Sequence, residues 1–250
     1  FRDYSCLEEI DISDSVVSID YDAFYGCSKL IEVSIPNSVK SIGGGVFYQC
    51  SSLRKVTLPN SVKSIGGGAF SQCTSLVIVK IPSSVAFIEN DLFYKCTSIG
   101  EIKIPDSVTS IGSGSFSHCS NLKQIIIPDS VCFIGSGAFY GCSSLTKAVL
   151  SNCLTSIEEG TFKYCSALNE VHLKNSLNSI EYNAFDTCVN LERISIPASV
   201  KIINQYAFVH CIKLKEVCFE HNSSLKIIDD RAFQDCHSLE QFQIPQSVTR

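Results

Sequence analysis

The sequence predicts a solenoid, in which short coils of chain stack on one another around one continuous apolar core. Two observations carry this prediction. Cysteine recurs at intervals of 23 residues from Cys27 to Cys211, and Cys236 follows after a two-residue insertion. Phenylalanine stands three residues before each of these cysteines, from Phe24 to Phe233. A fixed period of roughly 20–50 residues is typical of repeat architectures, because one unit this short cannot bury its own apolar side.

The repeat covers the chain without a break. Its unit, L-x-x-[VI]-x-[IL]-P-x-S-V-x-x-I-G-x-x-A-F-x-x-C-x-x, fits the 250 residues about ten and a half times. No linker or shift in composition interrupts it, so we expect a single elongated domain over residues 1–250 with about ten 23-residue repeats. The chain has no initiator Met and no signal-peptide pattern, and Phe1 and Arg250 are interpreted as cut ends of a longer protein.

The first half of each unit predicts a short strand. Val33 and Ile35, following Leu30, form a period-2 pair that is typical of a strand with one buried face. Pro36 ends this strand because proline lacks a backbone donor. Strands of successive coils should lie parallel, about 4.7–4.9 Å apart, with right-handed crossovers.

The second half of the unit predicts a corner and a second packed element. Gly43–Gly45 allows a turn with positive φ. Val46, Phe47 and Cys50 follow at i, i+1 and i+4, which fits a short helical turn packed inward. The second face should therefore carry short helical turns or short strands. The predicted buried ladder includes Phe47, Cys50, Phe70, Cys73, Phe116, Cys119, Phe139 and Cys142.

These patterns together resemble a known class of repeat. The segments IPNSVKSIGGGVFYQCSSL, LPNSVKSIGGGAFSQCTSL and IPDSVTSIGSGSFSHCSNL are similar to BspA-like leucine-rich repeats, and the resemblance spans nearly the whole chain. It implies a leucine-rich-repeat solenoid that is displayed at the cell surface or secreted. It also implies a non-enzymatic role in adhesion to host matrix, host cells or other microbes. An intracellular protein-interaction scaffold that uses the same face is the alternative.

The chain departs from the pattern mainly in its second half. Ser151, Lys174 and Glu220 replace the repeated proline, and Cys153 replaces a repeated serine. An insertion between about residues 221 and 225 alters one corner and carries the glycosylation signal Asn222-Ser223-Ser224. These departures loosen the repeat without ending it.

Several chemical classes find no support in the residues. The glycine corner lacks the G-x-x-x-x-G-K-[ST] pattern of a phosphate loop. Without a C-x-x-C motif, a metal site is not expected, and no cofactor is implied. A net charge of -5 without a run of Lys or Arg argues against nucleic acid, and no apolar stretch approaches the ~20 residues that span a bilayer.

The cysteines are expected to be free thiols. Stacked coils would place ladder Cβ atoms ~4.7 Å apart, whereas bridged Cβ atoms lie ~3.5–4.5 Å apart. Cys6, Cys132, Cys153 and Cys218 lie outside the ladder, each at a different position of the repeat, so no pair is expected among them. Histidines beside ladder cysteines, such as His118 and Cys119, do not make a nucleophile, because a nucleophile must be exposed and activated.

A binding surface is expected where the repeats differ most, at the second and fourth residues after the repeated leucine. Ile126 and Val149 should expose apolar groups there, flanked by Lys80, Lys103 and Lys147, which suits a protein partner or an anionic glycan. A second candidate surface is a discontinuous stripe of tyrosines, each directly after a repeated phenylalanine, although packing against neighbouring coils also explains them: Tyr25, Tyr48, Tyr94 and Tyr140. End-to-end association through open ends is a further expectation. The candidate binding residues are Ile78, Lys80, Glu101, Lys103, Gln124, Ile126, Lys147, Val149, Glu170 and His172.

Overall fold

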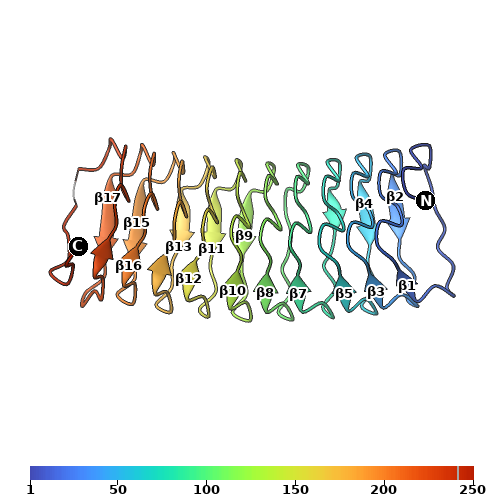
Figure 1. Cartoon of the computed structure of the whole chain (residues 1–250), viewed down its shortest axis with the longest axis horizontal. Coiled ribbons are helices and arrows are strands. Elements are labelled where there is room, and N and C mark those ends of the chain that lie inside the picture. The colour runs from blue at the N-terminus through green and yellow to red at the C-terminus, as the bar shows by residue number, and fades with distance from the viewer. Residues whose placement is uncertain (241) are drawn as a thin grey trace.

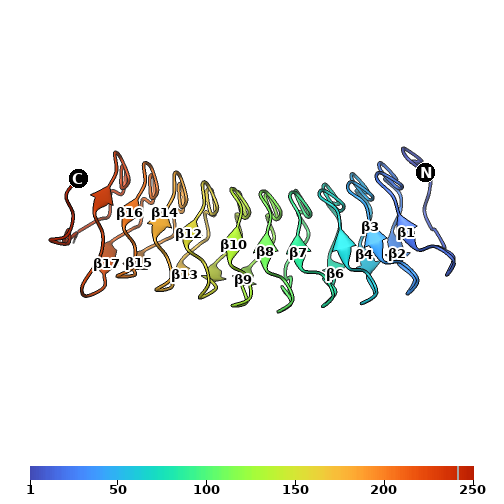
Figure 2. The same cartoon turned by 60° about the horizontal axis from the view of Figure 1, so that its bottom comes forward.

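The chain winds into a long row of stacked coils, with its N- and C-termini at opposite ends of the stack (Figure 1). A computed structural model describes residues 1–240 and 242–250. Two rows of short parallel strands run along the stack, and both are visible in Figure 2. The predicted parallel-strand solenoid is confirmed.

The first row of strands lies where the L-x-x-[VI]-x-[IL] pattern predicted it. Within the described residues it forms three sheets, in the orders β2-β4-β6, β13-β11-β9 and β15-β17. Its strands are β2 (Glu32–Ser34), β4 (Lys55–Thr57), β6 (Ile78–Val79), β9 (Gln124–Ile126), β11 (Lys147–Val149), β13 (Glu170–His172), β15 (Arg193–Ile196) and β17 (Glu216–Phe219).

The second row follows the S-V-x-x-I segment, so the prediction of short strands on the second face is confirmed. These sheets have the orders β1-β3-β5, β10-β8-β7 and β12-β14-β16-β18. The strands are β1 (Ser18–Ile19), β3 (Ser41–Ile42), β5 (Ser64–Ile65), β7 (Phe87–Ile88), β8 (Ser110–Ile111), β10 (Phe133–Ile134), β12 (Ser156–Ile157), β14 (Ser179–Ile180), β16 (Ile202–Ile203) and β18 (Ile227–Ile228).

The core is a stack of aligned side chains from successive coils. The rings of Phe47 and Phe70 lie parallel, with centroids 5.6 Å apart, and those of Phe116 and Phe139 lie 5.4 Å apart. All eight residues of the predicted ladder are fully buried. Ring burial and offset stacking therefore stabilise every contact between coils along the axis.

The ladder cysteines also bond to the backbone. The Sγ of Cys73 donates to the carbonyl oxygen of Phe47 at 3.0 Å, and that of Cys142 donates to the carbonyl of Phe116 at 3.2 Å. Burial raises the pKa of the Cys142 thiol to about 12. The expected burial of these thiols is confirmed, and each thiol in addition satisfies a buried carbonyl of the coil before it.

The predicted helical turn at Val46–Cys50 is wrong. Within the described residues the corner is built from consecutive turns rather than a helix. Gly45 and Gln49 have φ of 62° and 60°, which a right-handed helix does not allow. The Phe47 N–H donates to the Ala69 carbonyl of the next coil at 2.8 Å, whereas the Cys50 N–H donates within its own turn, to Phe47 at 3.0 Å. Backbone donors that alternate between two coils leave no i to i−4 ladder for a helix.

Candidate functional site

The central first-row strands align the candidate residues in two columns. In the β9-β11-β13 sheet, Lys147 pairs with Gln124 and Glu170 on either side. Val149 pairs likewise with Ile126 and His172, which gives the second column. Because side chains alternate between the faces of a strand, both columns point away from the core. The structure therefore brings six of the ten candidate residues onto one patch.

Ile126 is the apolar centre of this patch. Its side chain is 60% exposed, although the neighbouring Ile125 is buried. The prediction for Val149 was only partly right, because this side chain is half-buried between its neighbours. The exposed apolar surface on β9 and β11 is therefore smaller than the sequence indicated, and it is concentrated on Ile126.

The other four candidates lie on the N-terminal side of β9. Ile78, on β6, is 58% exposed, and Lys80 follows it in the chain. Glu101 and Lys103 lie in the next coil, which forms no strand between residues 101 and 104. The first row is thus interrupted between β6 and β9 (Figure 1). Gly100 precedes this stretch, and glycine weakens a strand because it has no side chain to pack.

A hollow occupies this interruption. It has a volume of about 420 Å³ and lies beside Ile126, Glu101 and Lys103. Gln124 and Asp106 also line it, so a partly exposed apolar floor carries a polar rim. Such a combination is typical of a surface that binds a protein rather than a small molecule.

The charged side chains of the first strand row differ in whether they form ion pairs. Glu170 accepts from Lys147 Nζ at 2.6 Å and lies 2.6 Å from His172 Nε2. The Lys147 hydrogen bond, followed by that of His172, lowers the pKa of Glu170. Lys147 was expected as a free cation at the rim of the patch, but its charge is neutralised by Glu170.

Among the described residues, two candidate lysines that lie outside the patch are not held in ion pairs. Lys80 and Lys103 are exposed and, within residues 1–240 and 242–250, form no ion pair. Toward the two ends of the stack, charged residues in the column of Lys147 are paired: Lys55 with Glu32 at 3.3 Å, and Arg193 with Glu216 at 3.1 Å. The centre of the face therefore combines apolar exposure with cations available to a ligand.

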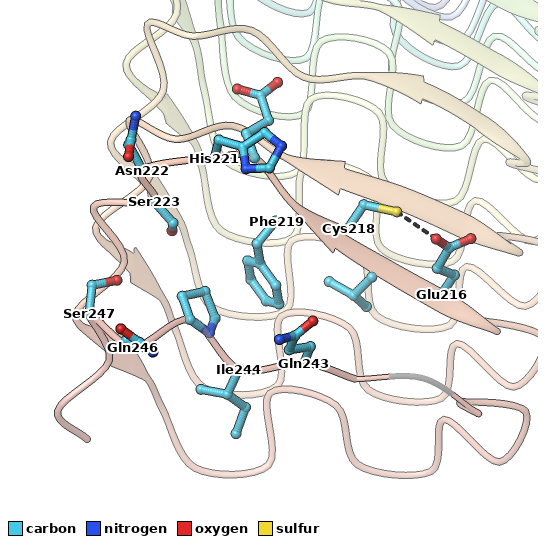
Figure 3. Close-up of a pocket in the computed structure, with 13 residues that line it drawn as sticks. Glu216, Cys218, Phe219, His221, Asn222, Ser223, Gln243, Ile244, Gln246 and Ser247 are labelled. Atoms are coloured by element: carbon cyan, nitrogen blue, oxygen red, sulfur yellow. Dashed lines mark hydrogen bonds between the residues drawn. The ribbon is translucent and has the colours of Figure 1, made fainter.

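A second concave region lies near the C-terminus. A groove of about 720 Å³ separates β17 from the segment 243–247 and reaches the corner formed by the insertion (Figure 3). Cys218 donates to Glu216 at 2.9 Å, and His221 lies at the corner, away from this pair. Asn222 lines the same corner and is exposed, as expected for the glycosylation signal. The insertion predicted a change at this corner but not the groove.

The tyrosine stripe is divided into separate aromatic contacts. Tyr94, His118, Tyr140 and Tyr164 form one run of edge-on rings, with successive centroids 5.2–5.9 Å apart. The rings of Tyr25 and Tyr48 stack at 5.0 Å, and both side chains are half-buried against neighbouring coils. This arrangement supports packing as the role of these two residues.

The buried cysteines are unsuited to nucleophilic chemistry. Burial raises the pKa of Cys119 well above its ordinary value and removes the thiol from solvent, so the adjacent His118 has no accessible thiolate to activate. In the part of the chain that the structure describes, no group of three or more His, Cys, Asp or Glu side chains is placed to hold a metal ion. The same residues include no helix long and apolar enough to cross a bilayer.

Comparison with known proteins assigns the class. The family model described as BspA type leucine rich repeat region (6 copies) matches residues 1–123, 86–215 and 133–250. The chain therefore belongs to the BspA-type leucine-rich repeat family. No curated protein matches it significantly in sequence.

Several solved structures are similar to this chain. A leucine-rich repeat protein from Bacteroides ovatus is 27% identical, with a TM-score of 0.52, over 90% of this chain and 81% of that chain. A leucine-rich repeat protein from Eubacterium ventriosum has a TM-score of 0.59 at 18% identity, over 94% and 83% of the two chains. The T. pallidum leucine-rich repeat protein TpLRR is 32% identical over 70% of this chain and 72% of its own, with a TM-score of 0.49. The fold is thus that of leucine-rich repeat solenoids, a class that is typically non-enzymatic.

Proposed function

We propose that this chain is a protein-binding module that recognises a surface ligand through the central part of its first strand row. The observation that carries the proposal is the exposure of Ile126 beside the hollow at residues 101–104, which Lys103 also lines. Lys80 is exposed in the coil before Lys103, and neither lysine forms an ion pair within the described residues. An exposed apolar centre with a charged rim matches the anatomy of protein interfaces. The module acts by binding, without catalysis.

Membership of the BspA-type family supports a ligand on host matrix, on a host cell or on another microbe, and a location at the cell surface or in secretion. An intracellular scaffold would use the same face. Antibody labelling of intact source cells separates the two, because only a surface protein is labelled before the cells are permeabilised.

The proposal is tested by measuring binding of the chain to immobilised matrix proteins, mucins and glycans. Ile126→Glu places a carboxylate at the centre of the patch and should weaken binding to a protein at least about tenfold, as expected for a residue at an interface centre. Phe133→Glu is the matched control, because Phe133 is 50% exposed but lies on the second row of strands. Equal binding by both variants would reject the patch.

The partner class is read from the same panel. Protein ligands that bind the wild type but not Ile126→Glu support the proposal. Binding confined to anionic glycans, weakened by Lys80→Ala and Lys103→Ala but not by Ile126→Glu, would replace it with glycan recognition through the lysines. Association between copies of the chain is a separate proposal, and sedimentation velocity at rising chain concentration tests it.

A further inference from the structure

Two exposed cysteines lie on neighbouring coils. Cys132 directly precedes β10, and Cys153 lies in the turn before β12. These two strands stand next to each other along the stack (Figure 2), but they do not pair, because one second-row sheet ends at β10 and the next begins at β12. The second row is thus interrupted at the place where the two thiols lie.

Hydrogen bonds fix the register of this contact. Asn152 stacks on Asp129, with its N–H donating to Asp129 Oδ1 at 2.8 Å and its Nδ2 donating to Oδ2 at 2.9 Å. Cys153, the next residue, therefore stands over Ser130 of the coil before. The Sγ of Cys132 turns back toward the same residue and lies 3.8 Å from the Ser130 carbonyl oxygen.

The Cys132 thiol thus turns toward the residue over which Cys153 stands. The Cys153 side chain, through its hydrogen bond, is the largest cause that raises the pKa of Cys132, ahead of desolvation. The exposure of both thiols separates the pair from the ladder thiols, which are buried except for the half-buried Cys236 and donate to carbonyls, as Cys142 does to Phe116 at 3.2 Å. Cys132 and Cys153 are solvent-accessible and therefore open to oxidation.

We propose that Cys132 and Cys153 form a disulfide that staples the two coils together at the interruption between β10 and β12. Both thiols are free in the structure, as expected from the sequence, so the proposal concerns an oxidised form of the chain. Bridged Cβ atoms lie about 3.5–4.5 Å apart, and the exposed turn that carries Cys153 precedes β12, which does not pair with β10, so it can move to meet this distance. The bond would supply a covalent link where the strand hydrogen bonds are missing.

Exchange with a low-molecular-weight disulfide forms this bond. One protein thiol loses its proton, and its thiolate attacks the small disulfide, which forms a mixed disulfide and releases a small thiolate. The second protein thiolate attacks the sulfur of the first cysteine and releases the other small thiolate. The two small thiolates take up the two protons, so that two protein thiols are oxidised and one small disulfide is reduced.

The test treats the reduced 250-residue chain with oxidised glutathione, followed by proteolysis without reduction and mass spectrometry. The expected product is one linked peptide that contains Cys132 and Cys153 and lacks two hydrogen atoms. Separate glutathione adducts on the two residues, or a bridge to a second copy of the chain, would overturn the proposal.

Variants distinguish a staple from a general effect of oxidation. Oxidation should raise the unfolding midpoint of the wild type and of Cys6→Ser by about 5 °C or more, but not that of Cys153→Ser. Cys6 is exposed and lies outside the pair, so Cys6→Ser is the matched control. Cys153→Ser restores the serine that most repeats carry at this position, so it should fold. The same rise in Cys153→Ser as in the wild type would contradict the staple.

Discussion

Replacing Phe116 by alanine removes one ring from the middle of the aromatic stack. The side chain has 0% exposure, and its ring lies 5.4 Å from both Phe93 and Phe139. Truncation of a buried Phe costs about 3–5 kcal/mol of unfolding free energy. Because both faces of the ring are stacked and each aromatic pair contributes about 0.5–1.5 kcal/mol beyond burial, we expect the upper part of this range, about 4–5 kcal/mol.

The assay is urea unfolding followed by far-UV circular dichroism, with Phe133→Ala in parallel. Phe133 is 50% exposed on β10, so its truncation should cost no more than about 1 kcal/mol. The comparison also controls for loss of cooperativity, to which long repeat arrays are prone. If Phe116→Ala costs no more than Phe133→Ala, the stacked-ring core is refuted.

Two further predictions concern pH and strand formation. Burial raises the pKa of Cys50 to about 12 from 9.0, so the folded chain keeps a proton that the unfolded chain releases. This thiol should leave the free energy of unfolding unchanged below about pH 9 and lower it by about 1.4 kcal/mol per pH unit between pH 9 and 12. Urea unfolding at a series of alkaline pH values should therefore show a shallower decline of this free energy for Cys50→Ala than for the wild type. Gly100 occupies the position that Thr146 occupies two coils later, where the coil forms a strand. Gly100→Thr should therefore raise the free energy of unfolding by about 0.5–1 kcal/mol. An unchanged or lower value would show that Gly100 is not the cause of the interrupted strand row and its hollow.

The 23-residue period of the sequence was sufficient to predict which side chains form the core. A residue type repeated at a fixed interval has the same environment in every inner coil, so one buried phenylalanine implies the others from Phe24 to Phe208. Strand alternation also followed from pattern, because Ile125 is buried between exposed Gln124 and Ile126. These features depend on contacts that repeat along the chain, and repetition makes them visible in the sequence.

The corner could not be predicted in the same way. The spacing of Val46, Phe47 and Cys50 fits a helical turn, but the Phe47 N–H bonds to the next coil, and such a bond depends on stacking geometry. The approach of Cys132 to the position over which Cys153 stands was missed for a related reason, since the Cys132 side chain turns back toward Ser130. Side-chain direction at an irregular coil leaves no trace in a periodic pattern.

The sequence predicted which positions form the candidate site, but not which of its charged side chains form ion pairs. Variation between repeats located the outward columns, yet it gave Lys147 as a free cation although Glu170 holds it at 2.6 Å. Gly100 was the available signal for the interrupted strand row. A glycine at a position otherwise occupied by larger residues indicates a weakened strand.

The most direct test of the binding surface is a footprint of lysine acetylation. The chain is labelled alone and in complex with the matrix protein that binds it most tightly in the panel. We predict slower acetylation of Lys80 and Lys103 in the complex, with no change at Lys63 and Lys201, which are exposed beside the second row. Protection of Lys63 and Lys201 with Lys80 and Lys103 unchanged would contradict binding through the first row.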